Sequence, residues 1–288
     1  MQRDFRTMSV KIIVDSAVDM SEKYCSGAET VPLTVRFENE EYRDRVDLDA
    51  REFYAKLIDS DVMPTTSQAN ISQFSDVFER EVKAGNDVVV ITVSSKLSGT
   101  YHSACIAAEE YPGRVFVVDS MSVSIGAGIL AEFALLLADA GLRAPGIVKR
   151  LMLERNNVKV LAVFNTLEYL KRGGRISQGA AFAGSLLSIK PIITVRDGEI
   201  DILGKARGLR HAYGFLTKEI EKEGGIDFRK PLLLGYTGFD DTELQNFVLE
   251  SEHLWECGSD ELETAIVGSA VGTHAGPGAF AIAFYARK

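Results

Sequence analysis

Short runs of β-branched and other apolar residues alternate with helical patterns through the first half of the chain, and this order constrains the fold most. The runs lack polar alternation, which is typical of parallel strands buried on both faces. They occupy residues 10–16, 31–37, 87–94 and 115–120, and the helical patterns occupy residues 47–60, 70–85, 98–111 and 122–140. Asn70 and Gln73 resemble a capping box, and Gly85 stands where a helix C-terminus is expected. Strands alternating with helices predict a mainly parallel sheet flanked by helices.

The second half of the chain has a different pattern, with a hairpin and fewer crossovers. An Asp197-Gly198 pair between two apolar runs is typical of a tight β-hairpin turn. Further strands are expected at 158–164, 231–236, 265–269 and 279–285, and helices at 166–174, 209–223 and 242–255, the last with Asp240 and Glu243 as a capping box. We therefore predict a two-domain α/β protein. Residues 1–157 form a domain with a mainly parallel sheet flanked by helices, and residues 158–288 form an α+β domain with a mixed or antiparallel sheet.

Composition and charge disfavour several classes of function. The 288 residues carry 41 acidic and 32 basic side chains, a formal net charge of −9, which argues against nucleic acid and anionic membranes as partners. The most apolar stretch, residues 125–142, is interrupted by Glu132 and Asp139, so we expect a buried helix there. Three widely spaced cysteines fit a reducing compartment, and the first residues lack the apolar segment of a signal peptide. We expect a cytoplasmic protein with no stable membrane insertion.

Loops rich in hydroxyl side chains follow several of the predicted strands. In an open parallel sheet, ligands bind outside the carboxyl ends of the strands. Ser98, in the segment 94–100, stands where a helix N-cap is expected, and Gly99 leaves the backbone amides approachable, so an anion such as a carboxylate or phosphate is a candidate ligand. A second cluster, Pro64-Thr65-Thr66-Ser67-Gln68, precedes the helix that starts near Asn70. Both loops could equally do no more than cap their own helices.

Most familiar catalytic motifs are missing from the sequence. There is no GxxxxGK[ST] phosphate loop and no GxSxG nucleophile elbow. Gly126, Gly128 and Ala131 match a loose dinucleotide fingerprint, but they lie inside a helical pattern, where small residues favour close packing instead. The four histidines form no HxxH pair, so we expect no metal site.

Two segments of the second half contain the remaining candidate functional side chains. Residues 171–177 place Lys171, Arg172 and Arg175 around a Gly-Gly turn. Residues 272–278 surround His274 with small residues, and we expect them to form a loop between two strands. A histidine in such a loop exposes a ring whose pKa lies in the physiological range.

These loops, taken together and in order, resemble the DegV family of bacterial fatty-acid-binding proteins. The resemblance covers nearly the whole chain, from Asp15-Ser16 to the His274 loop, and five motifs carry it: residues 64–68, 94–101, 167–177, 189–192 and 272–279. It implies a two-domain protein that holds one long-chain fatty acid in a tunnel between the domains. It also implies a partner, an ATP-dependent fatty-acid kinase subunit that phosphorylates the bound carboxylate to an acyl phosphate. No other cofactor is implied.

The resemblance also assigns roles to particular residues. Thr66 and Ser98 would bind the carboxylate, with Thr65, Ser67 and Ser95 close by. His274 and Arg175 would lie near the head group, and Arg175 and Arg207 could neutralise the added phosphoryl charge. Residues 125–140 and 180–187 would be tunnel walls. The chain departs from the family pattern at Ala17, where another hydroxyl is frequent, and at residues 205–210, which hold fewer lysines than is common.

Two other functions remain open from the sequence. The first is a serine-dependent acyl hydrolase that uses Ser98 or Ser95 as nucleophile with His274 as base. The base would come from the other domain, and no orienting acid is evident in the sequence. The second is a nucleotide-dependent phosphotransferase, which lacks a phosphate loop.

Overall fold

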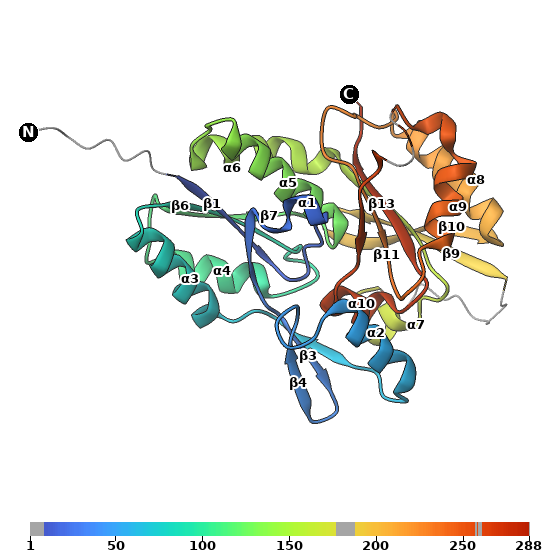
Figure 1. The fold of residues 1–288 in the computed structure, drawn as a ribbon, viewed down its shortest axis with the longest axis horizontal. Helices are drawn as coiled ribbons and strands as arrows, with labels where there is room; N and C mark the ends of the chain where they lie inside the picture. Colours follow the sequence, from blue (N-terminus) through green and yellow to red (C-terminus); the bar gives the residue numbers. More distant parts are fainter. Residues whose placement is uncertain (1–8, 177–187, 257, 259–260, 288) are drawn as a thin grey trace, which may run out of the picture.

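A computed structural model describes residues 9–176, 188–256, 258 and 261–287 (Figure 1). Its N-terminal sheet has four parallel strands in the order β2-β1-β6-β7: Ala28–Val31, Val10–Asp15, Asp87–Thr92 and Val115–Asp119. Helices α3 (Ile71–Lys83) and α4 (Thr100–Ala108) cover one face of this sheet, and α5 (Ile125–Asp139) and α6 (Ala144–Glu154) cover the other. The predicted parallel sheet flanked by helices is confirmed.

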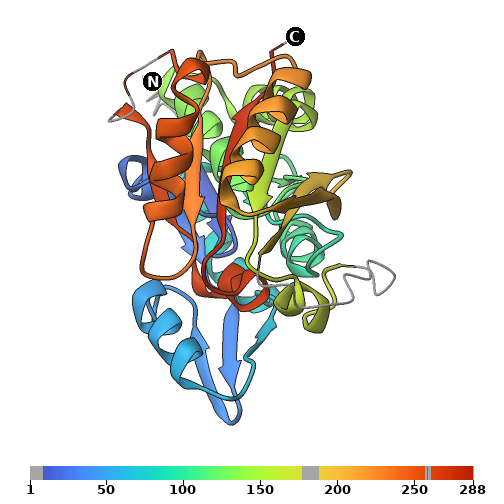
Figure 2. The ribbon, with the colours of Figure 1, turned by 90° about the vertical axis from the view of Figure 1, so that its right-hand side faces the viewer.

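The C-terminal sheet has six strands in the order β10-β9-β8-β13-β11-β12. They span Glu199–Arg207, Ile189–Arg196, Val158–Val163, Phe280–Tyr285, Leu233–Tyr236 and Thr264–Ile266. All neighbours in this sheet are antiparallel except β11 and β12, so the predicted mixed sheet is confirmed. Helices α8 (Leu209–Lys222) and α9 (Thr242–Glu250) cover its outer face (Figures 1 and 2). The domain boundary at 157/158 stays a prediction; β8 begins at Val158.

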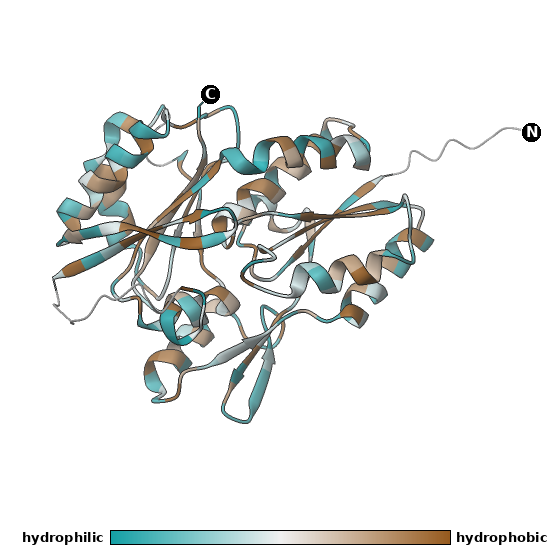
Figure 3. Cartoon of the chain, turned by 180° about the vertical axis from the view of Figure 1, so that it is seen from behind, coloured by the Kyte–Doolittle hydropathy of each residue, from teal (hydrophilic) through white to brown (hydrophobic). Residues whose placement is uncertain are grey.

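Helix α5 packs between the two sheets and is buried along most of its length. Its small residues explain how it fits: a side chain at Gly126 would collide with Val160 of β8, and one at Gly128 would collide with the carbonyl of Asp19. These residues therefore allow close packing on both sides, as expected from the sequence. Hydrophobic residues gather on the strands and on the helix faces that cover them (Figure 3). No helix among the described residues is both long and apolar enough to cross a membrane.

A third sheet corrects one prediction. Residues 31–37 were expected to form a single parallel strand, but the chain changes sheet at Pro32, which has no N–H to donate to a strand ladder. Strand β3 (Thr34–Phe37) lies instead between β4 (Glu40–Arg43) and β5 (Thr65–Ser67) in a small antiparallel sheet, and helix α2 (Ala50–Asp59) follows β4. This small sheet and α2 form the lower part of the molecule in Figure 2.

The short elements complete the fold and correct two further predictions. They are α1 (Glu22–Cys25), α7 (Glu168–Arg172), α10 (Ser269–Ala275) and single 3₁₀ turns at Arg155–Asn157 and Glu252–Leu254. The strand expected at 265–269 ends at Ile266, and the expected loop around His274 is helix α10. The capping box expected from Asp240 and Glu243 does not form, because the N-cap of α9 is Asp241 and its side chain makes no capping bond.

Candidate functional site

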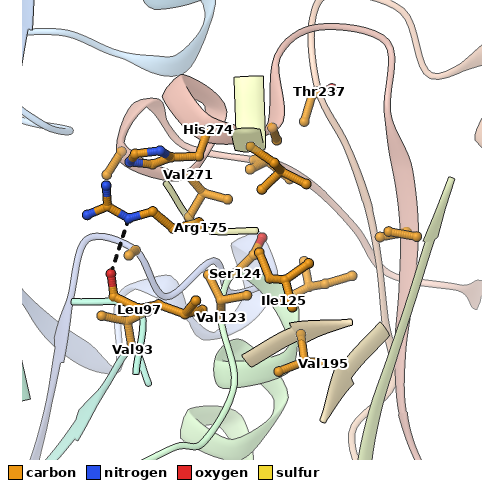
Figure 4. Close-up of a pocket in the computed structure, with 18 of the residues that line it drawn as sticks. Val93, Leu97, Val123, Ser124, Ile125, Arg175, Val195, Thr237, Val271 and His274 are labelled. Carbon is orange, nitrogen blue, oxygen red and sulfur yellow. Dashed lines mark hydrogen bonds between the residues drawn. The ribbon is translucent and has the colours of Figure 1, made fainter. Parts of the chain in front are cut away.

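A cavity of about 400 Å³ lies where the three sheets meet (Figure 4). Its volume is within the usual range for small-molecule sites. Most of its lining is apolar, and the contributing residues come from the ends of β1 and β6, from the start of α5, from the C-terminal sheet and from α10. Polar side chains gather at one end, where β5, the loop before α4, the turn after α7 and α10 meet: Thr66, Ser67, Gln68, Ser98, Arg175 and His274.

The C-terminal sheet forms the floor of the cavity. In the strand register, Ala162 of β8 lies opposite Ile193 of β9 on one side and Ala281 of β13 on the other, and Ala281 lies opposite Gly235 of β11. Residues paired in this way share one face of a sheet. Three of these four residues are Ala or Gly, so the floor is set back from the N-terminal domain at its centre, which leaves room for an apolar chain.

Thr66 and His274 meet at the polar end, although 208 residues separate them. Thr66 Oγ1 lies 2.8 Å from His274 Nε2, while His274 Nδ1 is buried and has no hydrogen-bond partner among the residues that the structure describes. Burial, helped by the nearby charge of Arg175, lowers the pKa of His274 to about 4, so the ring is neutral at pH 7. A buried N–H without a partner is rarer than an unpaired acceptor, which favours a proton on Nε2. His274 then donates to Thr66, and the Thr66 hydroxyl proton remains available to a ligand.

Arg175 supplies the positive charge at this end of the cavity. The turn after α7 carries it, and its side chain points toward the His274 ring in Figure 4. Its guanidinium donates to the carbonyl oxygens of Leu97, at 3.3 Å, and Gly173. Burial lowers the pKa of Arg175, but an arginine stays charged at neutral pH. Among the described residues, no carboxylate forms an ion pair with it, so its charge is available to an anionic ligand.

Ser98 lines the cavity, but it is not the predicted N-cap of α4, because that residue is Gly99. Its hydroxyl accepts a 3.2 Å hydrogen bond from the backbone N–H of Thr100, the first residue of α4, and lies 2.9 Å from Thr100 Oγ1. Gln68 packs tightly against Gly99 and donates to Ser103 Oγ at 2.9 Å. The two hydroxyl-rich segments, residues 64–68 and 94–100, therefore lie side by side, and the hydrogen bond from Thr100 does not remove Ser98 from the cavity lining.

The structure brings five of the eight predicted site residues to the cavity: Thr66, Ser67, Ser98, Arg175 and His274. Thr65, Ser95 and Arg207 are not among its described lining residues. Thr65 is exposed and pairs with exposed Arg36, on the opposite face of the small sheet from Thr66. Ser95 donates its backbone N–H to Asp119 at 3.2 Å, and Arg207 is exposed at the end of β10.

The predicted walls fit the structure only in part. Of residues 125–140, only Ile125 lines the cavity, together with Val123 and Ser124 before it. Residues 180–187 lie outside the described residues. Sequence reasoning assigned no role to Gln68 or Thr237, which also line the cavity; the position of Gln68 next to the hydroxyl cluster was the available signal for the first of them.

The geometry also bears on metal and hydrolase chemistry. Within the described parts of the chain, no three His, Cys, Asp or Glu side chains gather as metal ligands. A serine hydrolase needs a histidine that is hydrogen-bonded to the nucleophile and oriented by an acid. Here the His274 ring bonds to Thr66 rather than to a serine, and no acid in the described part of the chain forms a hydrogen bond with its Nδ1.

Known proteins resemble this chain over almost its full length. The DegV family model matches residues 9–287. DegV domain-containing proteins from Caldanaerobacter subterraneus and Deinococcus radiodurans are 35% and 33% identical to it, and each alignment covers 96% of this chain and 98% of the relative.

Solved structures agree with the sequence comparisons. A fatty-acid-binding DegV family protein from Thermus thermophilus superposes with a TM-score of 0.86 at 30% identity, covering 97% of this chain and 100% of that one. A stearic acid-binding protein from Eubacterium ventriosum superposes with a TM-score of 0.83 at 28% identity, covering 96% and 98%. Fold, site and sequence thus agree, and the chain belongs to the DegV family.

Proposed function

We propose that this protein binds one long-chain fatty acid, with the acyl chain in the cavity and the carboxylate at its polar end. The observation that carries the proposal is the cavity itself, which is apolar along most of its wall and has its arginine, its histidine and most of its polar side chains gathered at one end. A long amphiphile with a single anionic head matches that distribution. The fatty-acid-binding DegV family protein of Thermus thermophilus and the stearic acid-binding protein of Eubacterium ventriosum support the same assignment.

Burial of the acyl chain supplies most of the binding free energy in this proposal. Each buried methylene contributes about 0.8 kcal/mol, so about fifteen of them contribute up to about 12 kcal/mol. Association and ordering of the chain reduce this gain by several kcal/mol. The remainder is enough for tight retention without any polar contact, so the polar end governs orientation and selectivity for a carboxylate.

The head group is proposed to lie between Thr66 and Ser98, close to Arg175. A buried carboxylate without partners is costly, so it needs hydrogen-bond donors and a positive charge. Thr66 can donate because His274 occupies its acceptor side, Ser98 adds a second hydroxyl, and Arg175 supplies the charge. Ser67 and Gln68 also line the cavity and are candidates to bind a water or the second carboxylate oxygen. We propose no direct contact for Thr65, Ser95 or Arg207.

We further propose that the protein is a carrier whose bound fatty acid is the substrate of an ATP-dependent kinase. The kinase transfers the γ-phosphoryl group of ATP to a carboxylate oxygen, which gives acyl phosphate and ADP. A site that holds the carboxylate with hydroxyls and one arginine, and presents no nucleophile aligned with a base, favours presentation of the ligand over its hydrolysis. Because the reaction consumes ATP, the cytoplasm is the expected compartment.

Lipid extraction of freshly purified protein, followed by mass spectrometry, tests the binding proposal. We expect close to one long-chain fatty acid per chain, or stoichiometric uptake of added palmitate by protein stripped of lipid. Protein that is folded, carries no lipid and does not take up palmitate, oleate or stearate would contradict it.

Chemical trapping tests the kinase proposal separately. Protein loaded with labelled palmitate is incubated with ATP and a cell extract of the source organism, and hydroxylamine converts any acyl phosphate to the acyl hydroxamate. We expect labelled hydroxamate that depends on ATP and on the loaded protein. An equal yield from free palmitate without the protein would rule out the carrier role while leaving fatty-acid binding intact.

A further inference from the structure

Two buried carboxylates, one of them paired with an arginine nearer the surface, lie outside the cavity at the N-terminus of α10. The carboxylates are those of Asp19, on the loop after β1, and Asp44, on the loop after β4, and the arginine is Arg45. Asp19 is 1% exposed and Asp44 is 0% exposed. None of the three is among the described residues that line the cavity. Buried carboxylates are costly unless they are paired and hydrogen-bonded, so their contacts indicate what they do.

Asp44 holds the first turn of α10. Its two carboxylate oxygens accept hydrogen bonds from the backbone N–H groups of Ser269 and Ala270, each at 3.2 Å. The N-cap residue is Gly268, which has no side chain to satisfy these donors. A carboxylate from a residue 225 positions away therefore takes the place of a local cap, and its negative charge also suits the positive end of the helix.

Asp19 ties the same helix start to the rest of the site. One of its oxygens accepts the backbone N–H of Gly268 at 2.9 Å and pairs with Arg45, and the other accepts the hydroxyl of Ser124 at 2.6 Å. Ser124 is the N-cap residue of α5 and lines the cavity. The two aspartates thus link α10, the start of α5 and the small sheet that carries Thr66.

Helix α10 depends on this support. It has seven residues, including Gly272 and the β-branched Val271 and Thr273, and an isolated helix of this length is unstable in water. His274 lies one turn beyond Ala270, about 6 Å along the helix axis. A shift or fraying at the first turn therefore moves the ring that bonds to Thr66.

We propose that Asp44 is a positioning residue for the head-group site: through the first turn of α10 it places His274 against Thr66, and Asp19 keeps that helix in register with α5. The role in ligand binding rests on the proposed function, whereas the placement of His274 does not. Asp44 itself touches neither the ligand nor the imidazole.

The test measures the titration of His274 by NMR in protein free of lipid. In the wild type, burial holds the pKa of His274 at about 4. In Asp44→Ala we expect that pKa to rise by at least one unit toward its usual value of about 6.5, because a loosened helix exposes the ring. Asp44→Asn keeps one acceptor and should give an intermediate shift. Asp87→Ala is the matched control, since Asp87 is also a buried carboxylate, paired with Arg114 at the far end of β6.

Binding gives the second readout. Asp44→Ala should weaken palmitate binding about tenfold and leave hexadecanol binding within about threefold, because only the carboxylate uses the Thr66–His274 pair. An unchanged His274 titration in folded Asp44→Ala would overturn the proposal. Failure of both Asp44 variants to fold would also overturn it, because the carboxylate would then support the whole fold. A shifted titration in a protein that never binds palmitate would retain the positioning role and refute the proposed function.

Discussion

Replacement of Thr66 by valine is the sharpest test of the head-group site. Valine has nearly the shape of threonine and lacks only the hydroxyl, so the cavity keeps its volume. The hydroxyl lies 2.8 Å from His274 Nε2 and faces the cavity from a strand that is otherwise exposed. Its loss removes one donor to the proposed carboxylate. Among the described residues it also leaves both ring nitrogens of His274 without a hydrogen-bond partner, because Nδ1 already has none.

The expected magnitude follows from the type of hydrogen bond lost. A buried hydrogen bond to a charged group contributes about 1.5–3 kcal/mol, so the dissociation constant for palmitate should rise about 10- to 150-fold. The unpaired imidazole nitrogen should also lower the free energy of unfolding by about 1–3 kcal/mol. Hexadecanol has an alkyl chain of the same length with a hydroxyl in place of the carboxylate, and its affinity should change much less.

Calorimetry on protein stripped of lipid measures both ligands, and Thr65→Val is the control. Thr65 pairs with exposed Arg36, whereas Thr66 pairs with fully buried Val35, so the two neighbours project from opposite faces of the small sheet. The same chemical change at Thr65 should leave palmitate affinity unaltered. Equal losses for Thr65→Val and Thr66→Val, or an equal loss of palmitate and hexadecanol binding by Thr66→Val, would refute the placement of the carboxylate.

Three further predictions follow from the structure. Ser98→Ala should weaken palmitate binding about tenfold and lower the free energy of unfolding by about 1 kcal/mol, since Ser98 lines the cavity and its hydroxyl accepts the backbone N–H of Thr100. Calorimetry and urea titration measure the two effects. Gly173→Ala should weaken palmitate binding, because the added Cβ would lie 2.1 Å from His274 Nδ1. Gly214→Ala in α8 is the control, since the structure places no atom within 4 Å of the added Cβ. It should leave palmitate binding unchanged and stabilise the protein by about 0.5–1 kcal/mol. Burial raises the pKa of Asp15 from 3.8 to about 7, so between these values the folded state holds a proton that the unfolded state releases. The free energy of unfolding of the wild type should therefore fall as pH rises from 5 to 8. Urea titrations should find that this fall is smaller in Asp15→Asn, by up to about 3 kcal/mol.

Features of the fold that depend on neighbouring residues could be predicted from the sequence. The Asn70–Gln73 capping box forms with both reciprocal hydrogen bonds, and the Asp197-Gly198 pair makes the β9–β10 turn with φ values of 51° and 81°. In both cases the groups that satisfy the backbone lie within a few residues of one another. Sequence pattern contains that information directly.

Features that depend on distant residues could not be predicted in this way. The glycines at 272 and 276 predicted a loop around His274, but the segment is a helix. Asp44 and Asp19, more than 200 residues away in sequence, accept the N–H groups of Ser269 and of the N-cap Gly268. The same limit applies to the third sheet, since periodicity shows that residues 31–37 are extended but not which sheet each half joins. Tertiary contacts override local propensity at both places.

The candidate site was predictable residue by residue only in part. Family resemblance pointed to Thr66, Ser98, Arg175 and His274, and all four line the cavity. It also pointed to Thr65 and Ser95. Both lie close in sequence to residues that line the cavity, but neither is among the described lining residues. Strand alternation separates Thr65 from Thr66, and that alternation becomes certain only once β5 is known to pair with β3.

The charges at the polar end match a ligand with one negative charge. Arg175 provides one permanent positive charge, and His274 stays neutral because burial and Arg175 both oppose its protonation. A monoanionic carboxylate and Arg175 compensate each other, so neither is buried unpaired. In the proposed kinase reaction the acyl phosphate carries more negative charge than the carboxylate. The imidazole does not supply the balancing charge at neutral pH, so the phosphoryl group should lie toward solvent or toward cations of the partner subunit, outside the cavity that holds the acyl chain.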